Sequence, residues 1–153
     1  MTRVLFVCLG NICRSPTAEA IFRDKVEKAG LAEDFEIDSA GTIGEHSGNP
    51  ADSRMREHAA RRGYDLSSIS RKIHPADFHR YDLILAMDRE NLVDLRDICP
   101  PEHRAKVRLM MGYAPQLGVE IVPDPYYGGS QGFERVLDLL EVACEGLLRE
   151  LTP

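Results

Sequence analysis

The sequence has 153 residues, of which 43% are hydrophobic, and its 25 acidic against 19 basic side chains give a formal net charge of −6. This length and composition are typical of one folded domain over residues 1–153. They exclude a disordered chain and a small scaffold that depends on disulfides or a metal for its stability. The acidic balance argues against binding of nucleic acid or membranes through the overall field, and without an apolar run of about 18–20 residues we expect a cytoplasmic protein.

The first strand and helix follow each other closely. Residues 3–8 form a continuous apolar run rich in β-branched side chains, which predicts a strand buried on both faces. Ser15 suits an N-cap and Pro16 the first helical position, and apolar residues then recur at helical spacing until Gly30. The pattern predicts a strand, a tight loop and a helix.

The same alternation is repeated in the next segment. Residues 35–40 read as a second strand, which leads into a loop bounded by glycines. A helix is expected to open at Asn49 and Pro50 and to close at Gly63. This order of strands and helices favours a parallel sheet.

The second half of the chain continues the pattern. Residues 81–87 are the clearest buried strand, and Asp88 is placed to cap the helix that follows. Residues 106–110 predict a fourth strand, and residues 133–151 an amphipathic helix. We therefore expect an α/β fold, a single doubly wound domain with helices on both faces of a parallel sheet, whose ligands bind beyond the carboxyl ends of the strands.

The loop between the first strand and helix carries the residues for chemistry. Cys8 ends the strand, and Arg14 stands at the start of the helix. Backbone N–H groups at such a position favour an anion, and a guanidinium can bind two oxygens of a phosphate at once. The same donors favour the thiolate, which is the nucleophilic form of cysteine. The predicted phosphate-binding residues are Leu9, Gly10, Asn11, Ile12, Cys13, Arg14 and Ser15.

A cysteine at a strand end is, by itself, more often a core residue than a catalyst. The combination of Cys8 with Gly10, Arg14 and Ser15 reverses that preference, because it supplies a thiol, a permissive backbone, a clamp and a hydroxyl. Asn11 can adopt a left-handed backbone and brace the loop with its side chain. We therefore interpret the loop as a site of thiol-based phosphoryl transfer.

A nucleophile of this kind needs a general acid from elsewhere in the chain. Asp124 is the best candidate, since Pro123 and Pro125 stiffen its loop. Its carboxyl group can protonate the departing oxygen and then, as a carboxylate, activate water. Tyr126 and Tyr127 follow directly and can form walls of a pocket for a flat ring.

With these motifs the chain resembles the low-molecular-weight protein tyrosine phosphatases over nearly its whole length. The matching segments are residues 7–16, 38–42, 86–88 and 124–127, in the order and spacing of that family. The position of the cysteine also fits, because larger tyrosine phosphatases carry it late in the chain. Here it follows the first strand.

The resemblance implies a four-stranded parallel sheet, no metal or other cofactor, and hydrolysis of phosphotyrosine and aryl phosphates through a phosphocysteine. It makes Cys8 the nucleophile, Arg14 the phosphate clamp and Asp124 the general acid and base. The implied residues of loop support are Asn11, Ser15 and Ser39. The implied partners are phosphotyrosine proteins or peptides and small aryl phosphates, with inorganic phosphate as product and inhibitor.

The chain departs from the family's pattern at two places. Glu45 stands in the wall of the substrate pocket where many members carry a tryptophan, and the histidine that many members place near Ser68 is absent. These departures concern substrate preference and loop support. Cys13 adjoins Cys8 in the loop, and a reversible Cys8–Cys13 disulfide that protects the nucleophile is a further hypothesis.

Two other functions remain as alternatives. An arsenate reductase on the same fold would need two further cysteines close together, whereas Cys99 stands alone and Cys144 falls in the last helix. A non-catalytic phosphate or phosphopeptide binder would keep the loop, but it would gain nothing from Asp124 near a dianion. The residues thus favour the phosphatase over both alternatives.

Overall fold

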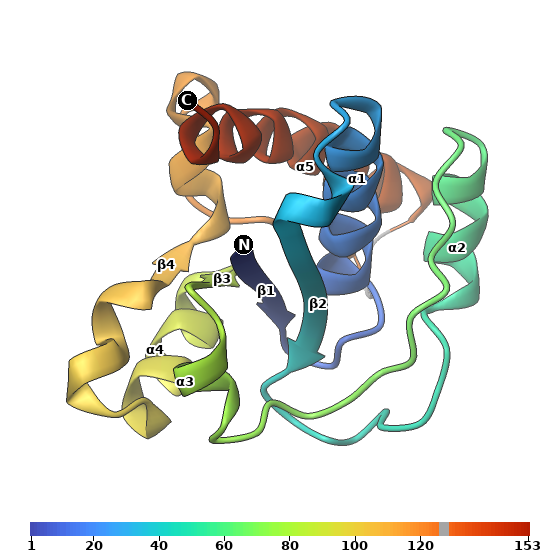
Figure 1. Cartoon of the computed structure of the whole chain (residues 1–153). Coiled ribbons are helices and arrows are strands. Elements are labelled where there is room, and N and C mark those ends of the chain that lie inside the picture. The colour runs from blue at the N-terminus through green and yellow to red at the C-terminus, as the bar shows by residue number, and fades with distance from the viewer. Residues whose placement is uncertain (126–128) are drawn as a thin grey trace.

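A parallel sheet lies at the centre of the fold (Figure 1). The computed structural model describes residues 1–125 and 129–153. Within this part of the chain the sheet has four strands in the order β2-β1-β3-β4, all paired in parallel. The strands are β1 (Thr2–Cys8), β2 (Phe35–Gly41), β3 (Leu83–Ala86) and β4 (Val107–Leu109). The predicted fold class, a four-stranded parallel α/β sheet, is confirmed.

The central strand β1 is buried on both faces, which explains its continuous apolar run. Val4 and Phe6 contribute to one hydrophobic cluster, whereas Leu5 and Val7 contribute to another, and all four are fully buried. Successive side chains of a strand point to opposite faces, so a strand with a core on each side needs an apolar residue at every position.

Helices cover both faces of the sheet. The cluster around Val4 and Phe6 includes buried residues of α1 (Arg14–Lys28), α2 (Ser53–Ala60) and α5 (Ser130–Leu151). The other cluster includes residues of α3 (Asp77–Arg80) and α4 (Arg89–Ile98). Short 3₁₀ turns complete the fold at Ala32–Asp34, Pro101–Lys106, Met110–Tyr113 and Pro115–Leu117.

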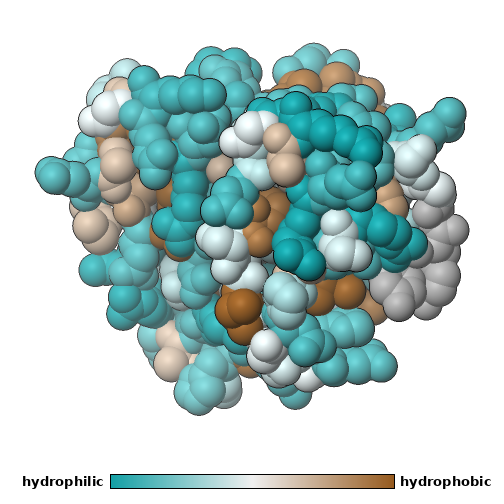
Figure 2. Space-filling view, turned by 90° about the vertical axis from the view of Figure 1, so that its right-hand side faces the viewer, coloured by the Kyte–Doolittle hydropathy of each residue, from teal (hydrophilic) through white to brown (hydrophobic). Residues whose placement is uncertain are grey.

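The surface seen in Figure 2 is mainly hydrophilic, and its apolar side chains are scattered. Among residues 1–125 and 129–153, no helix combines the length and the apolar character that crossing a membrane requires.

Two helix starts differ from the sequence-based expectation. Helix α1 begins at Arg14, so that Ser15 lies inside its first turn and turns its hydroxyl group to Cys8 instead of capping the helix. Helix α2 begins at Ser53, because Pro50 is engaged in an isolated β-bridge with Ile69. Its N-cap is Asp52, whose carboxylate accepts the backbone N–H groups of Arg54 and Met55.

Candidate active site

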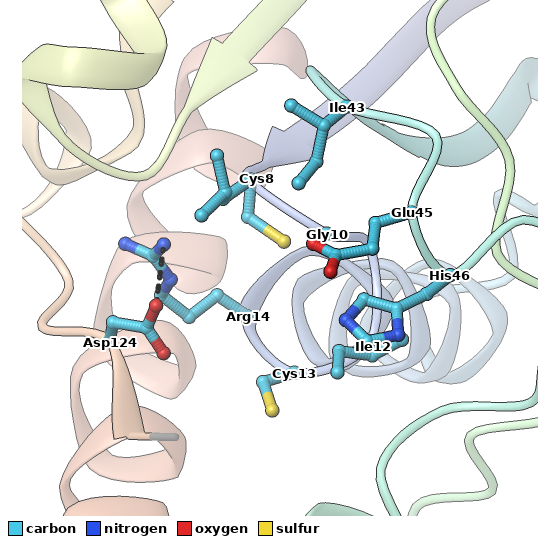
Figure 3. Close-up of a pocket in the computed structure, with 10 residues that line it drawn as sticks. Cys8, Gly10, Ile12, Cys13, Arg14, Ile43, Glu45, His46 and Asp124 are labelled. Atoms are coloured by element: carbon cyan, nitrogen blue, oxygen red, sulfur yellow. Dashed lines mark ion pairs between the residues drawn. The ribbon is translucent and has the colours of Figure 1, made fainter. Parts of the chain in front are cut away.

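The loop between β1 and α1 curls around the thiol of Cys8 at the carboxyl end of the central strand (Figure 3). Cys8 is 3% exposed, and its Sγ lies 3.0 Å from the hydroxyl oxygen of Ser15. The segment after β2 holds the loop in place, since the N–H groups of Thr42 and Ile43 donate to the carbonyl groups of Cys8 and Leu9. Residues 9–14 thus lie at the N-terminus of α1, where an anion is stabilised.

Gly41 allows the segment after β2 to approach this loop closely. A Cβ atom at this position would lie 2.8 Å from the carbonyl oxygen of Leu9 and 3.0 Å from that of Ile43. A Cβ atom on Gly10 would lie 2.9 Å from the ring of His46, so the pocket wall also rests directly on the loop. The two glycines let the segment after β2 lie close against the loop beside the thiol.

Asn11 braces the loop from inside. Its φ of 58° places it in the left-handed region, which asparagine tolerates better than most residues. Its side-chain oxygen accepts the backbone N–H of Arg71 at 3.0 Å, and its side-chain nitrogen donates to Ser15 at 2.8 Å and to Ser39 at 3.0 Å. The structure therefore brings the three predicted support residues into one network.

Arg14 is almost fully buried beside the thiol. Its Nη1 atom donates to Asp88 at 2.7 Å and to the carbonyl oxygen of Val122 at 2.9 Å. Burial works to lower the pKa of Arg14, but Cys8, Asp88 and Asp124 together raise it above the usual value. The guanidinium is thus permanently charged and held in a fixed orientation.

Asp124 lies on the other side of the cavity mouth from the loop. Its carboxylate is 3.7 Å from Nη2 of Arg14, and its side chain is 38% exposed. Residues 122–124, which we call the acid segment, are fixed to the end of β3, because the N–H of Val122 donates to the carbonyl oxygen of Met87 at 2.8 Å. An exposed carboxyl group beside the phosphate clamp can exchange a proton with a departing oxygen.

Asp88 is a site residue to which sequence analysis gave no role in catalysis, since we placed it as a helix cap and within the matching segment 86–88 but not beside Arg14. It does cap α4, by accepting the N–H of Asn91 at 2.8 Å, while its other oxygen holds Arg14. The available signal was its position directly after the carboxyl end of a strand next to β1, where ligand-binding residues gather in such sheets.

A cavity of about 190 Å³ opens above the thiol. It is lined by Cys8, Leu9, Gly10, Ile12, Cys13, Arg14, Ile43, Glu45, His46 and Asp124. In Figure 3 the carboxylate of Glu45 extends over the loop toward the cavity. The predicted pocket residues Tyr126 and Tyr127 lie outside the described residues.

The other cysteines differ in their placement. Cys13 lines the cavity with Cys8, and burial, followed by the charge of Asp52, raises its pKa far above the usual value. Cys99 and Cys144 are buried away from the cavity lining, and burial raises the pKa of both. Neither is therefore placed for the thiol relay of an arsenate reductase.

Within the described ranges, no cluster of three or more His, Cys, Asp or Glu side chains could hold a metal ion.

Known proteins are similar to this chain in both sequence and fold. The sequence model of the family described as low molecular weight phosphotyrosine protein phosphatase matches residues 3–153. A low molecular weight protein-tyrosine-phosphatase of Streptomyces coelicolor is 50% identical over 149 residues, which cover 95% of this chain and 91% of that protein. The low molecular weight phosphotyrosine protein phosphatase of Homo sapiens is 42% identical over 96% of this chain and 94% of its own length. A crystal structure of a protein tyrosine phosphatase from Entamoeba histolytica superposes with a TM-score of 0.96 at 47% identity, covering 99% of this chain and 97% of the other.

Proposed function

Because the chain belongs to the low molecular weight phosphotyrosine protein phosphatase family, we propose that Cys8, Arg14 and Asp124 carry out hydrolysis of phosphotyrosine and aryl phosphates through a phosphocysteine. The main support for this proposal is that a buried thiol, a fixed guanidinium and an exposed carboxyl group line one cavity at the N-terminus of α1. These three groups are suited to transfer of the phosphoryl group from a dianionic ester to the sulfur atom.

In the first step the phosphoryl oxygens are bound by the backbone N–H groups of residues 9–14 and by the N–H groups of Arg14 that do not donate to Asp88 or Val122. The thiolate of Cys8 attacks phosphorus, the bond to the phenolic oxygen breaks, and Asp124 gives that oxygen a proton. In the second step Asp124, now a carboxylate, takes a proton from water that attacks the phosphocysteine. Inorganic phosphate leaves, and Ser15 donates a hydrogen bond to the returning thiolate.

The cavity walls support an aryl substrate. Leu9, Ile12 and Ile43 give the cavity an apolar lining, against which a phenyl ring can pack. Glu45 lies at the mouth, where the residues around a phosphotyrosine in a peptide would pass. We propose phosphotyrosine peptides and small aryl phosphates as substrates, and inorganic phosphate as product and inhibitor.

We also propose Cys13 as a reversible redox partner of Cys8, because both thiols line the same cavity. Peroxide would oxidise Cys8 to a sulfenic acid, and the sulfur of Cys13 would displace water to form a disulfide that a thiol reductant cleaves. Burial raises the pKa of Cys13 and keeps its attacking thiolate scarce, so this closure is slow near neutral pH and becomes faster as the pH rises. Recovery after peroxide treatment that is lost in Cys13→Ser supports the disulfide, whereas equal recovery contradicts it.

The proposal is tested by hydrolysis of p-nitrophenyl phosphate across pH without added metal. We expect Cys8→Ser to abolish the activity, and Asp124→Ala to reduce it and to remove the basic limb of the pH profile. A native protein that binds phosphate or arsenate but does not hydrolyse the ester would instead favour the binder or the reductase.

A further inference from the structure

A buried carboxylate on α1 has no part in the reaction described above. Glu19 is 6% exposed, and its Oε1 accepts a 2.6 Å hydrogen bond from the hydroxyl group of Ser39 on β2. Its Oε2 accepts two hydrogen bonds from Arg23, one helical turn further along, at 3.0 and 3.1 Å. A carboxylate inside a protein is costly unless it is paired, so its partners indicate what it does there.

Glu19 is one end of a continuous chain of hydrogen bonds that reaches Cys8. Ser39 accepts from the side-chain nitrogen of Asn11 at 3.0 Å, and the same nitrogen donates to Ser15 at 2.8 Å. The hydroxyl oxygen of Ser15 lies 3.0 Å from Sγ of Cys8. We call the three connecting side chains, Ser39, Asn11 and Ser15, the relay.

The direction of the first link is fixed at Glu19. A carboxylate can only accept, and a serine hydroxyl has one hydrogen, so the hydrogen of Ser39 points to Glu19. The lone pairs of Ser39 are then left for Asn11. The amide of Asn11 has no alternative orientation, since its oxygen accepts the backbone N–H of Arg71 at 3.0 Å.

The last link follows from the same count of hydrogens. Ser15 accepts from Asn11, which leaves the single hydrogen of Ser15 to be donated. Cys8 Sγ is the nearer acceptor at 3.0 Å, whereas the carbonyl oxygen of Ala40 lies at 3.4 Å. A hydrogen bond donated to the charged form of a group favours that form, which for Cys8 is the thiolate.

We infer that Glu19, held by Arg23, is a positioning residue that directs the relay so that Ser15 donates to the sulfur of Cys8. The inference rests on the proposed role of Cys8 as nucleophile. Arg23 orients the carboxylate and compensates its charge, and it is itself fixed by a hydrogen bond from Nη2 to the carbonyl oxygen of Ile37 on β2.

The relay and a simple field effect predict opposite results when Glu19 is replaced. A negative charge acting through space disfavours a thiolate, so its removal would promote ionisation of Cys8. Loss of the relay's acceptor instead frees the hydrogen of Ser39, loosens Asn11 and Ser15, and disfavours the thiolate. The sign of the change therefore separates the two explanations.

The test uses Glu19→Met, which removes the acceptor, and Glu19→Asp, which keeps the charge but shortens the reach to Ser39. Inactivation by iodoacetamide is followed against pH, because the thiolate is the form that reacts. We expect the midpoint of the rate profile to rise by about one pH unit in Glu19→Met, which lowers the thiolate fraction about tenfold below the midpoint, and to rise in the same direction in Glu19→Asp.

The matched control is Glu57→Met, because Glu57 forms an exposed pair with Arg61 at the same spacing on α2, at 2.8 Å. It should leave the midpoint unchanged. A midpoint that falls in Glu19→Met, or that stays unchanged in the folded Glu19→Asp protein, overturns the inference. These outcomes differ from failure of the proposed function, in which Cys8→Ser would retain activity toward aryl phosphate.

Discussion

Arg14 donates a 2.7 Å hydrogen bond to the carboxylate of Asp88, a residue 74 positions further along the chain. The bond links the loop after β1 to the segment after β3, the strand next to it in the sheet. The same Nη1 atom donates to the carbonyl oxygen of Val122, two residues before Asp124. The buried guanidinium of Arg14, which is the phosphate clamp, is therefore held at a fixed position relative to the acid segment.

This geometry predicts a specific effect of Asp88→Asn. One oxygen must still cap α4 by accepting from Asn91, so the new amide N–H₂ faces Arg14 and repels it. Misplacement of a positioning group by about 1 Å costs on the order of 10²-fold in rate, and we expect kcat/KM for p-nitrophenyl phosphate to fall by about 10- to 100-fold.

A matched control for this substitution is Asp52→Asn, which alters the corresponding cap of α2. It should keep nearly full activity, since no hydrogen bond or ion pair joins Asp52 to Arg14 within the described part of the chain. Phosphate inhibition should weaken only in Asp88→Asn. Equal kcat/KM values for Asp88→Asn and the native protein would mean that Asp88 serves only as a cap.

The close approach at Gly41 leads to a second prediction. A methyl group there would meet the backbone oxygens of Leu9 and Ile43, which cannot move without distorting the phosphate loop. Overpacking costs about 1–3 kcal/mol, and we expect Gly41→Ala to lower the Tm by roughly 2–10 °C and the activity by more than tenfold. Gly112→Ala is the control, because nothing lies within 4 Å of the added atom. Similar losses in both variants would contradict this explanation.

The two central strands could be predicted because β1 and β3 are buried on both faces and read as continuous apolar runs, as in residues 3–8. Strand β2 lies at an edge of the sheet, and its buried Phe35 and Ile37 alternate with half-buried acidic residues. The phosphate loop could be predicted because its chemistry needs particular residues within a short stretch. Helix α3 was not predicted, since its sequence Asp77–Arg80 has one turn and no periodicity to detect.

Contacts between distant segments could not be derived from the sequence. Glu19 lies in the second turn of α1, and an acidic residue in a helix usually faces solvent. Its burial depends on Ser39, which β2 brings opposite α1. The contact of Asp88 with Arg14 could not be derived either, because it forms only when the chain folds and brings the two residues together.

Glu45 leads to a prediction about substrate choice. Its side chain lines the cavity mouth and forms no ion pair with any residue that the structure describes. Opposite charges about 4 Å apart in water attract by about 1 kcal/mol, which corresponds to a roughly fivefold preference. We expect phosphotyrosine peptides with a flanking lysine to have a higher kcat/KM than matched peptides with a glutamate.

The ratio of the two kcat/KM values is the measurement, because it cancels effects common to both peptides. The ratio should approach one in Glu45→Gln and should shrink in the native protein as salt is added. A ratio that is unchanged in Glu45→Gln would place the source of selectivity in another residue.

The last prediction concerns the pairing of α2 with α5. Glu134 on α5 accepts hydrogen bonds from Arg62 at 2.7 Å and from His58 at 2.5 Å. Arg62, followed by His58, lowers the pKa of Glu134 below its usual 4.5. A carboxyl group with a lowered pKa in the folded state stabilises the fold above the unfolded pKa and loses this contribution as the pH falls through the folded value.

We therefore expect Glu134→Gln to lower the free energy of unfolding near about pH 7 and to have a smaller effect near about pH 3, because the contribution of the native carboxylate is lost as the pH falls through its lowered pKa. Urea unfolding at the two pH values measures the difference. Glu57→Gln is the control, since it removes a carboxylate from an exposed pair on α2, where ion pairs contribute little. Equal destabilisation by Glu134→Gln at both pH values would mean that the loss comes from packing, because only a charge-dependent contact disappears when the carboxylate is protonated.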